Sequence, residues 1–226
     1  MTDLVTLAGG TVLDELYVPL ECSARDFDRV IRRIRKVSPD VVFSTVVGSG
    51  TALFYRSFHE AGLDPERMPI ASLTTSEAEI AEMSPAVARG HVTAAPFFEA
   101  LDTPAAARFV AAYKRRWGEH SPVTACAEAA YFQIKLYAEA LARAGGDDPD
   151  ALLRQLLGLE IEAPQGRVRI DPENHHAELW PRVGRVGADG RFEVVWDPGV
   201  RVRPDPYFVA PTSDDWSAAR LASTVP

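Results

Sequence analysis

The stretch from Asp40 to Thr51, DVVFSTVVGSGT, constrains the fold of this chain more than any other. Its apolar residues run from Val41 to Phe43, give way to small polar residues, and resume before a Gly-Ser-Gly turn. An apolar run bounded by turn residues is typical of a strand buried in a parallel sheet. Ligands of open α/β sheets lie at the carboxyl ends of such strands. The stretch therefore predicts a buried strand whose end forms one side of a small-molecule site.

Strand and helix patterns alternate around this stretch. Strands are expected at 11–20, 41–47, 69–75 and 90–97, and amphipathic helices at 24–37 and 51–63. Ser76 and Glu79 form an S-x-x-E capping box, which predicts the start of a short helix. Alternation of this kind favours an α/β fold with a parallel sheet and right-handed crossovers.

The pattern changes after residue 98. Helices are expected at 104–118, 123–144 and 149–158 with no strand between them, the first of them opened by Thr103 as N-cap before Pro104. Short β segments follow at 164–171, 177–186 and 191–196, the last two joined by a turn at Asp189-Gly190. The proline-rich tail at 202–217 is expected to pack as extended chain over the body.

Composition limits the classes of partner. The 226 residues carry a net charge of −8, which argues against direct nucleic-acid binding because that requires clustered Lys and Arg. No apolar run reaches the roughly 18 residues of a membrane span. The first ten residues lack the basic and apolar regions of a signal peptide, so a cytoplasmic location is expected. The two cysteines, Cys22 and Cys126, are distant in sequence and are expected to be reduced, buried thiols.

Motifs for catalysis or for metal binding are incomplete. Gly48-Ser49-Gly50 lacks the third glycine of a dinucleotide fingerprint, and no Walker lysine follows it. His175-His176 with Asp171 and Glu173 could ligate a metal, but adjacent histidines point in different directions, and a polar loop is favoured. We expect no enzyme, no cofactor and no metal; a hydrolase that uses Cys126 or His175 is the alternative from another class.

Small polar residues recur where the expected strands end. Hydroxyls, free amides at a helix start and an aromatic wall would suit a small uncharged polar ligand. The other interpretation is that these residues serve only as helix caps and turns. The candidate ligand-binding residues are Thr45, Val46, Val47, Gly48, Ser49, Thr74, Thr75 and Phe97.

Several segments together resemble a known family. The stretches that carry the likeness are 9–20, 40–56, 69–83, 102–110, 127–140, 163–171, 203–209 and 214–217, and VVFSTVVGSGT and IASLTTSEAE are its most specific parts. They resemble the amide-sensing negative regulators of aliphatic amidase operons, which belong with the urea and short-chain-amide binding proteins of the branched-chain amino-acid receptor family. The resemblance implies the type 1 periplasmic-binding fold, in which two Rossmann-like lobes close on a ligand.

The resemblance also implies a division of the chain. Residues 1–98 would form the second lobe, 99–176 would be helices that complete the first lobe, and 177–226 would be the return hairpin of the second lobe and the tail. Most of the first lobe would be missing, so apolar side chains of the helices, among them Phe109, Tyr113, Phe132 and Leu136, are expected to be exposed.

The implied function is non-catalytic sensing of a short-chain amide or urea, with an RNA-binding antiterminator as the regulated partner. The alternative is an extracytoplasmic receptor that delivers urea, amides or amino acids to an ABC permease. That alternative would place the protein in the periplasm, if a signal peptide preceded the missing lobe.

Overall fold

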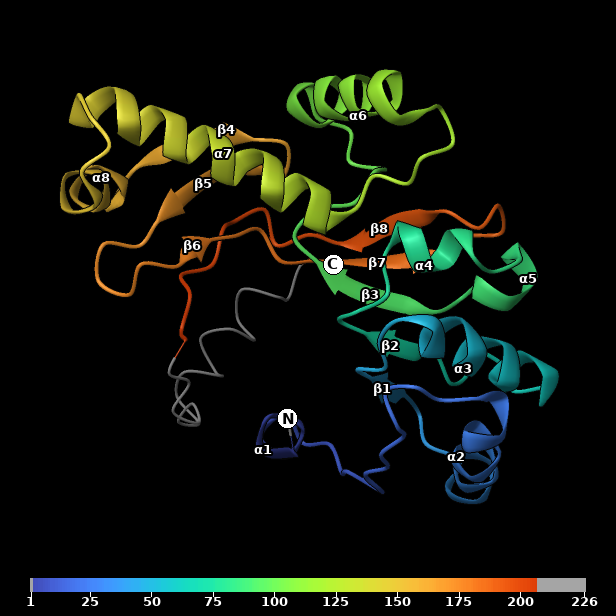
Figure 1. The fold of residues 1–226 in the computed structure, drawn as a ribbon. Helices are drawn as coiled ribbons and strands as arrows, with labels where there is room; N and C mark the ends of the chain where they lie inside the picture. Colours follow the sequence, from blue (N-terminus) through green and yellow to red (C-terminus); the bar gives the residue numbers. More distant parts are fainter. Residues whose placement is uncertain (1, 207–226) are drawn as a thin grey trace.

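The computed structural model describes residues 2–206, and it divides their strands between two sheets (Figure 1). The first sheet has the order β1-β2-β3-β7-β8. Its first three strands run parallel, and β7 and β8 are antiparallel additions at the β3 side. The strands are β1 (Val42–Ser44), β2 (Ile70–Ser72), β3 (Val92–Ala95), β7 (Arg182–Val186) and β8 (Phe192–Trp196). The predicted α/β class and its parallel strands are confirmed.

Helices between the strands supply the core of this part. Apolar side chains of α2 and α3 pack with Ile70 of β2 in one cluster, which includes the stacked rings of Phe27 and Phe54. Ser76 caps α4 and Glu79 bonds back to the Ser76 amide at 2.7 Å, as the capping box predicted. The helices are α1 (Thr2–Leu7), α2 (Ala24–Val37), α3 (Ser49–Glu60), α4 (Glu77–Ala81) and α5 (Pro85–Ala88).

The strand expected at 11–20 is wrong. This segment is irregular, and Tyr17 and Leu20 are exposed. It is held by side chains of α2 instead: Arg33 pairs with Asp14, and Arg29 donates to the carbonyl of Tyr17. The alternating pattern arises because Leu16 and Val18 pack on the core, which an extended coil can do without a strand partner.

A second group of elements lies beyond β3 and is drawn at the top of Figure 1. The long helix α7 packs Phe132, Leu136 and Ala140 against an antiparallel three-stranded sheet of order β4-β5-β6. Thr103 caps α6 through the Ala106 amide, as predicted. The elements are α6 (Pro104–Trp117), α7 (Ala125–Ala144), α8 (Pro149–Leu156), β4 (Glu160–Ala163), β5 (Gly166–Ile170) and β6 (Ala177–Glu178).

Burial corrects two expectations about this second group. Phe109, Phe132 and Leu136 are buried and Tyr113 is half-buried, because the helices pack on one another and on β4 and β5. The exposed large side chains of these helices are others: Trp117, Tyr131, Ile134, Tyr137 and Leu153. Cys22 and Cys126 are free, but neither is fully buried: Cys22 is half-buried and Cys126 is exposed.

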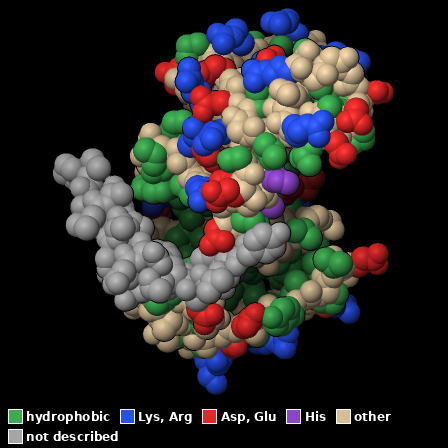
Figure 2. All heavy atoms as spheres, turned by 90° about the vertical axis from the view of Figure 1, so that its left-hand side faces the viewer, with side chains coloured by type: hydrophobic (Ala, Val, Ile, Leu, Met, Phe, Trp, Pro, Cys, Tyr) green, Lys and Arg blue, Asp and Glu red, His purple; other side chains and the backbone are tan. Residues whose placement is uncertain are grey.

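Three chain passages connect the groups at the same edge of the first sheet: one after β3, one before β7 and one after β8. β3 ends and β7 begins there, with Ala95 opposite Arg182 in the antiparallel register. The Arg182 side chain is 5% exposed and donates to the carbonyl of Pro96 and to the carboxylate of Asp197, each at 2.6 Å. On the face shown in Figure 2, the molecule is hollowed between its upper and lower parts. No helix in residues 2–206 is long and apolar enough to cross a membrane.

Most of the tail expected to pack over the body lies outside the described residues. Within them, Val202 forms an isolated antiparallel bridge with Leu179. The predicted turn at Asp189-Gly190 joins β7 and β8 and is confirmed. The division of the chain into lobe segments at residues 98 and 176 stays a prediction.

Candidate functional site

The loop after β1 and the first residue of α3 together contain five of the eight predicted ligand residues. Gly48 adopts a φ of 63°, a left-handed conformation that favours glycine, and it is the N-cap of α3. Gly50 is buried, and a Cβ at that position would lie 2.6 Å from the sulfur of Cys22. The glycines therefore allow a sharp turn and close approach of the helix start. The side chains of Thr45 and Ser49 are exposed and make no hydrogen bond to residues 2–206.

A network of hydroxyls ties the tips of β1 and β2 together. The carbonyl of Val46 accepts from the Thr74 hydroxyl at 2.9 Å and from the Thr51 hydroxyl at 3.0 Å. Ser72 Oγ accepts from the backbone amides of Thr74 and Thr75 at 3.0 and 3.1 Å. The structure thus brings residues 45–49, Thr74 and Thr75 to one sheet edge, as the sequence predicted.

Thr75 faces the interior rather than the open edge. It is buried, its hydroxyl donates to Ser72 Oγ at 3.0 Å, and it lies 3.1 Å from the hydroxyl of Tyr55. Burial raises the pKa of Tyr55 to about 12, so this phenol stays protonated at neutral pH. Thr75 therefore holds the edge in place, whereas Thr45 and Ser49 offer free hydroxyls.

Phe97 does not gather with the other predicted residues. Its ring is completely buried with Ala106 and Val123 and packs edge-on to Phe109 at 5.8 Å between ring centroids. The residue follows β3 at the same sheet edge, but its side chain turns into the core under α6. In this structure it presents no aromatic wall to a ligand.

The acidic side chains beside this sheet edge, Glu77 and Glu79, already accept hydrogen bonds from backbone amides. Glu77 Oε1 accepts from the Glu99 amide at 2.9 Å, and burial raises the pKa of Glu77 to about 7. Glu79 accepts from the amide and the hydroxyl of Ser76. The exposed donors of the edge are therefore hydroxyls and helix-start amides, which bind a polar molecule without reacting with it.

The histidines and cysteines do not form a catalytic or metal-binding group in the described part of the chain. His91 is buried, its Nδ1 accepts from the Ile70 amide at 2.9 Å, and burial lowers its pKa to about 4. Asp171 and Glu173, considered above as metal ligands, both pair with Arg203. Residues 2–206 contain no cluster of three or more potential metal ligands.

Two features were missed by the sequence interpretation. One is the Arg182 contact with Pro96 and Asp197 described above. The other is a cavity between α7 and the second sheet, at whose inner end Glu128 meets Gln165. Both depend on residues that are far apart in sequence, so no local pattern marks them.

Comparison with known proteins gives the family to which this fold belongs. The family model described as a periplasmic binding protein domain matches residues 1–213. The chain therefore belongs to the periplasmic binding protein family, and its fold matches the type 1 members of that family.

Solved and curated relatives agree with this assignment. A solute-binding protein of an ABC transporter from Rhodopseudomonas palustris BisB5, solved with 3,4-dihydroxybenzoic acid, is 29% identical with a TM-score of 0.77 over 89% of this chain and 55% of that one. The Leu/Ile/Val-binding protein homolog 6 of Brucella suis is 24% identical over 212 residues, which are 88% of this chain and 54% of the relative. The chain thus spans about half the length of these relatives.

One relative has an enzyme's name. The limonene hydroxylase of Geobacillus stearothermophilus is 29% identical over 109 residues, which are 48% of this chain and 20% of the hydroxylase. The match covers only a fifth of that protein and carries no catalytic activity over to this chain.

Proposed function

We propose that this chain is the ligand-holding part of a substrate-binding protein that delivers a small molecule to an ABC permease. The observation that carries the proposal is the sheet edge at Thr45 to Ser49, where free hydroxyls and helix-start amides follow a parallel strand. The relatives support the transport role, because the Rhodopseudomonas protein is described as a solute-binding protein of an ABC transporter. A substrate-binding protein of this kind works outside the cytoplasm.

We propose that the group of the ligand that contacts this edge is polar and uncharged. The donors and acceptors there are the hydroxyls of Thr45 and Ser49 and the first amides of α3, whereas Glu77 and Glu79 are bonded to backbone groups. Burying a charge against neutral groups alone is costly. An amide, urea or a ligand hydroxyl satisfies this edge, and any carboxylate on the ligand would have to find its partner elsewhere.

The amide-sensing regulator is the second candidate. It is favoured by the sequence likeness at 40–56 and 69–83, the two segments that build the hydroxyl network. In that case the partner is an RNA-binding antiterminator in the cytoplasm rather than a permease. Co-purification from the native host distinguishes the two candidates, because a permease subunit and an antiterminator differ in size and in solubility.

Calorimetry tests the binding function. Acetamide, butyramide, urea, leucine and 3,4-dihydroxybenzoate are titrated into this chain and into a fusion that supplies the remaining part of the Rhodopseudomonas relative. We expect heat of binding only from the fusion, because the ligand would lie between two lobes, the two walls of the site, and needs contacts from both. Heat from this chain alone at sub-millimolar ligand would contradict the two-wall site, and a fusion that binds none of the ligands would contradict the proposed function.

Two variants locate the ligand within the fusion. Thr45→Val and Ser49→Ala each remove an exposed hydroxyl with no partner among the described residues, so they should leave the fold intact. We expect each to weaken binding about tenfold, the equivalent of one hydrogen bond. Ser84→Ala is the matched control, because Ser84 is an exposed helix cap without a side-chain bond. Unchanged affinity in both edge variants would place the ligand elsewhere.

A further inference from the structure

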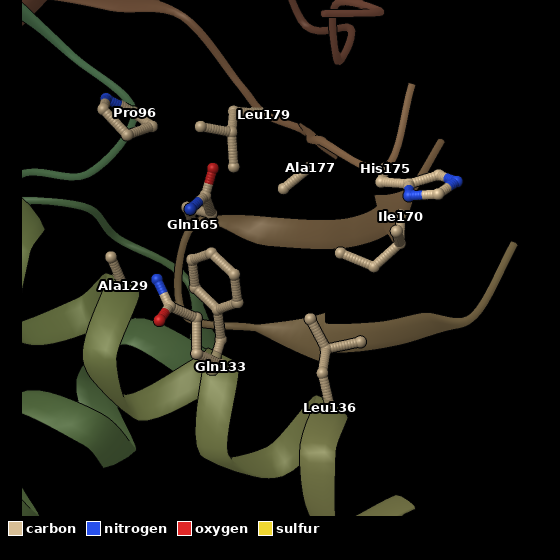
Figure 3. Close-up of a pocket in the computed structure, with 10 residues that line it drawn as sticks. Pro96, Ala129, Gln133, Leu136, Gln165, Ile170, His175, Ala177 and Leu179 are labelled. Atoms are coloured by element: carbon tan, nitrogen blue, oxygen red, sulfur yellow. The ribbon is translucent and has the colours of Figure 1, made fainter. Parts of the chain in front are cut away.

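A second cavity lies away from the sheet edge, between α7 and strands β5 and β6 (Figure 3). It has a volume of about 330 Å³, and none of the eight predicted ligand residues lines it. Its walls are mainly apolar, with Phe132 and Leu136 from α7 on one side and Ile170 from β5 and Leu179 on the other. This volume is at the lower end of the range of small-molecule sites, so the cavity suits a ligand with a single ring or a short aliphatic body.

The inner end of the cavity is polar and fixed in place. Gln165 is 1% exposed, its Nε2 donates to Glu128 Oε2 at 2.9 Å, and its Oε1 accepts from the Trp180 amide at 3.2 Å. A primary amide has two N–H groups and two acceptor lone pairs, so Gln165 keeps one donor and one acceptor position unused. Its orientation is set by the two bonds that it already makes.

A second amide stands beside the first. Figure 3 shows the Gln133 side chain directed toward the same end of the cavity as Gln165. The Gln133 side chain has no hydrogen-bond partner within residues 2–206. His175 lines the opposite end and is exposed, so water can reach it. The end of the cavity at Gln165 thus combines apolar walls with neutral donors and acceptors.

We propose that this cavity is a binding site for a small neutral molecule with an apolar body and one hydroxyl, such as a phenol or a cyclic alcohol. The hydroxyl would donate to one glutamine amide and accept from the other, and the ring would lie against Phe132, Ile170 and Leu179. An anion is disfavoured because the residues that line the cavity include no lysine or arginine. The site is independent of the sheet edge and of the proposed transport function.

Fluorine NMR with 4-fluorophenol tests the site on the full chain. We expect a saturable shift of the probe signal, with intermolecular NOEs to the methyl groups of Leu136, Ile170 and Leu179. 4-Fluorobenzoate at neutral pH should bind at least tenfold more weakly. No saturable shift at millimolar probe, NOEs to other methyl groups only, or equal binding of the anion would each overturn the proposal.

Neighbouring alanines of α7 provide a matched pair of variants. Ala129 lines the cavity, whereas Ala130 is exposed and does not. Ala129→Phe should fill the space and weaken 4-fluorophenol binding at least tenfold, and Ala130→Phe should change it less than twofold. Equal effects of the two variants would contradict the assignment.

Gln133→Leu covers the case in which Ala129→Phe does not fold. Gln133 is exposed and unbonded to other described residues, so its replacement spares the fold. The variant should lose most of the preference for 4-fluorophenol over fluorobenzene. An unchanged preference would show that the amide does not bind the hydroxyl.

Discussion

Replacing Ser72 by alanine removes one hydroxyl from the point where the tips of β1 and β2 meet. Ser72 is 3% exposed, and its Oγ accepts from the Thr74 amide at 3.0 Å and from the Thr75 amide at 3.1 Å. A buried amide left without an acceptor costs about 1 to 3 kcal/mol. Thr75 is buried and bears the full cost, whereas water can reach the half-buried Thr74. We therefore expect Ser72→Ala to lower the free energy of unfolding by about 2 to 4 kcal/mol.

Urea-induced unfolding followed by far-ultraviolet circular dichroism measures this loss. Ser84→Ala serves as the control, because that serine is exposed and makes no side-chain cap bond. The control should change the free energy of unfolding by less than about 0.5 kcal/mol. If Ser72→Ala lost less than about 1 kcal/mol, the two amides would have found other acceptors, and the view of Ser72 as the centre of this edge would be refuted.

Three further perturbations probe the fold away from this edge. Burial raises the pKa of Glu128 from 4.5 to about 7, so the folded protein holds a proton that the unfolded chain releases, and stability should fall as pH rises through that range. Glu128→Gln should reduce this loss of stability by about 1 to 3 kcal/mol, as measured by urea unfolding at several pH values, because the two proteins share all other titrating groups. An unchanged dependence of stability on pH would contradict the assignment of this loss to Glu128. Gly184→Ala places a Cβ 2.6 Å from the Phe98 ring and should lower the free energy of unfolding by about 1 to 3 kcal/mol in the same assay. Gly146→Ala is the control and should be neutral, because the space around Gly146 is open. Equal effects of the two variants would refute the steric argument. Arg182→Lys replaces the two guanidinium nitrogens that bond Asp197 and Pro96 by a single ammonium and should cost about 2 to 4 kcal/mol of stability. Arg143→Lys, at an exposed helix pair, should cost under about 0.5 kcal/mol. A neutral Arg182→Lys would show that this contact does not stabilise the fold.

Local signals in the sequence predicted most of the helices, although not α1 or α5. Thr103 before Pro104 and the Ser76–Glu79 box determine where helices begin through bonds within a single turn. The short strands at Val42–Ser44 and Ile70–Ser72 were found because they are apolar runs with turn residues after them. These predictable features depend only on residues that lie within a few positions of one another in the sequence.

Features that depend on distant residues could not be predicted. Alternation at 11–20 indicated a strand, but whether a strand forms depends on a pairing partner that the pattern does not specify. Phe97 follows a strand as expected, yet the direction of its ring depends on Phe109 in the next helix. The bond between Glu128 and Gln165 spans 37 positions, so the cavity beside it has no local signature.

The sequence interpretation correctly predicted that residues 45–49, Thr74 and Thr75 share one sheet edge, and it was incomplete about the bonds that these residues make. The edge formed by residues 45–49, Thr74 and Thr75 followed from the general geometry of parallel sheets. The sequence could not show that Thr74 and Thr75 use their hydroxyls internally, because Val46 and Ser72 accept those bonds only after the strands pair. The exposed hydroxyls of Thr45 and Ser49 have no partner among residues 2–206, and they are the ones that the proposed ligand would bind.

The antiparallel placement of β7 beside β3 has a mechanical consequence. Because Ala95 faces Arg182 and Val183 faces Trp196 in the register, the three passages to the second group of elements leave the first sheet side by side. A rotation of one group against the other would pivot about these three passages. Displacements would then be small beside β3 and would grow with distance across the sheet, so the loop after β1, at the far side, would swing furthest.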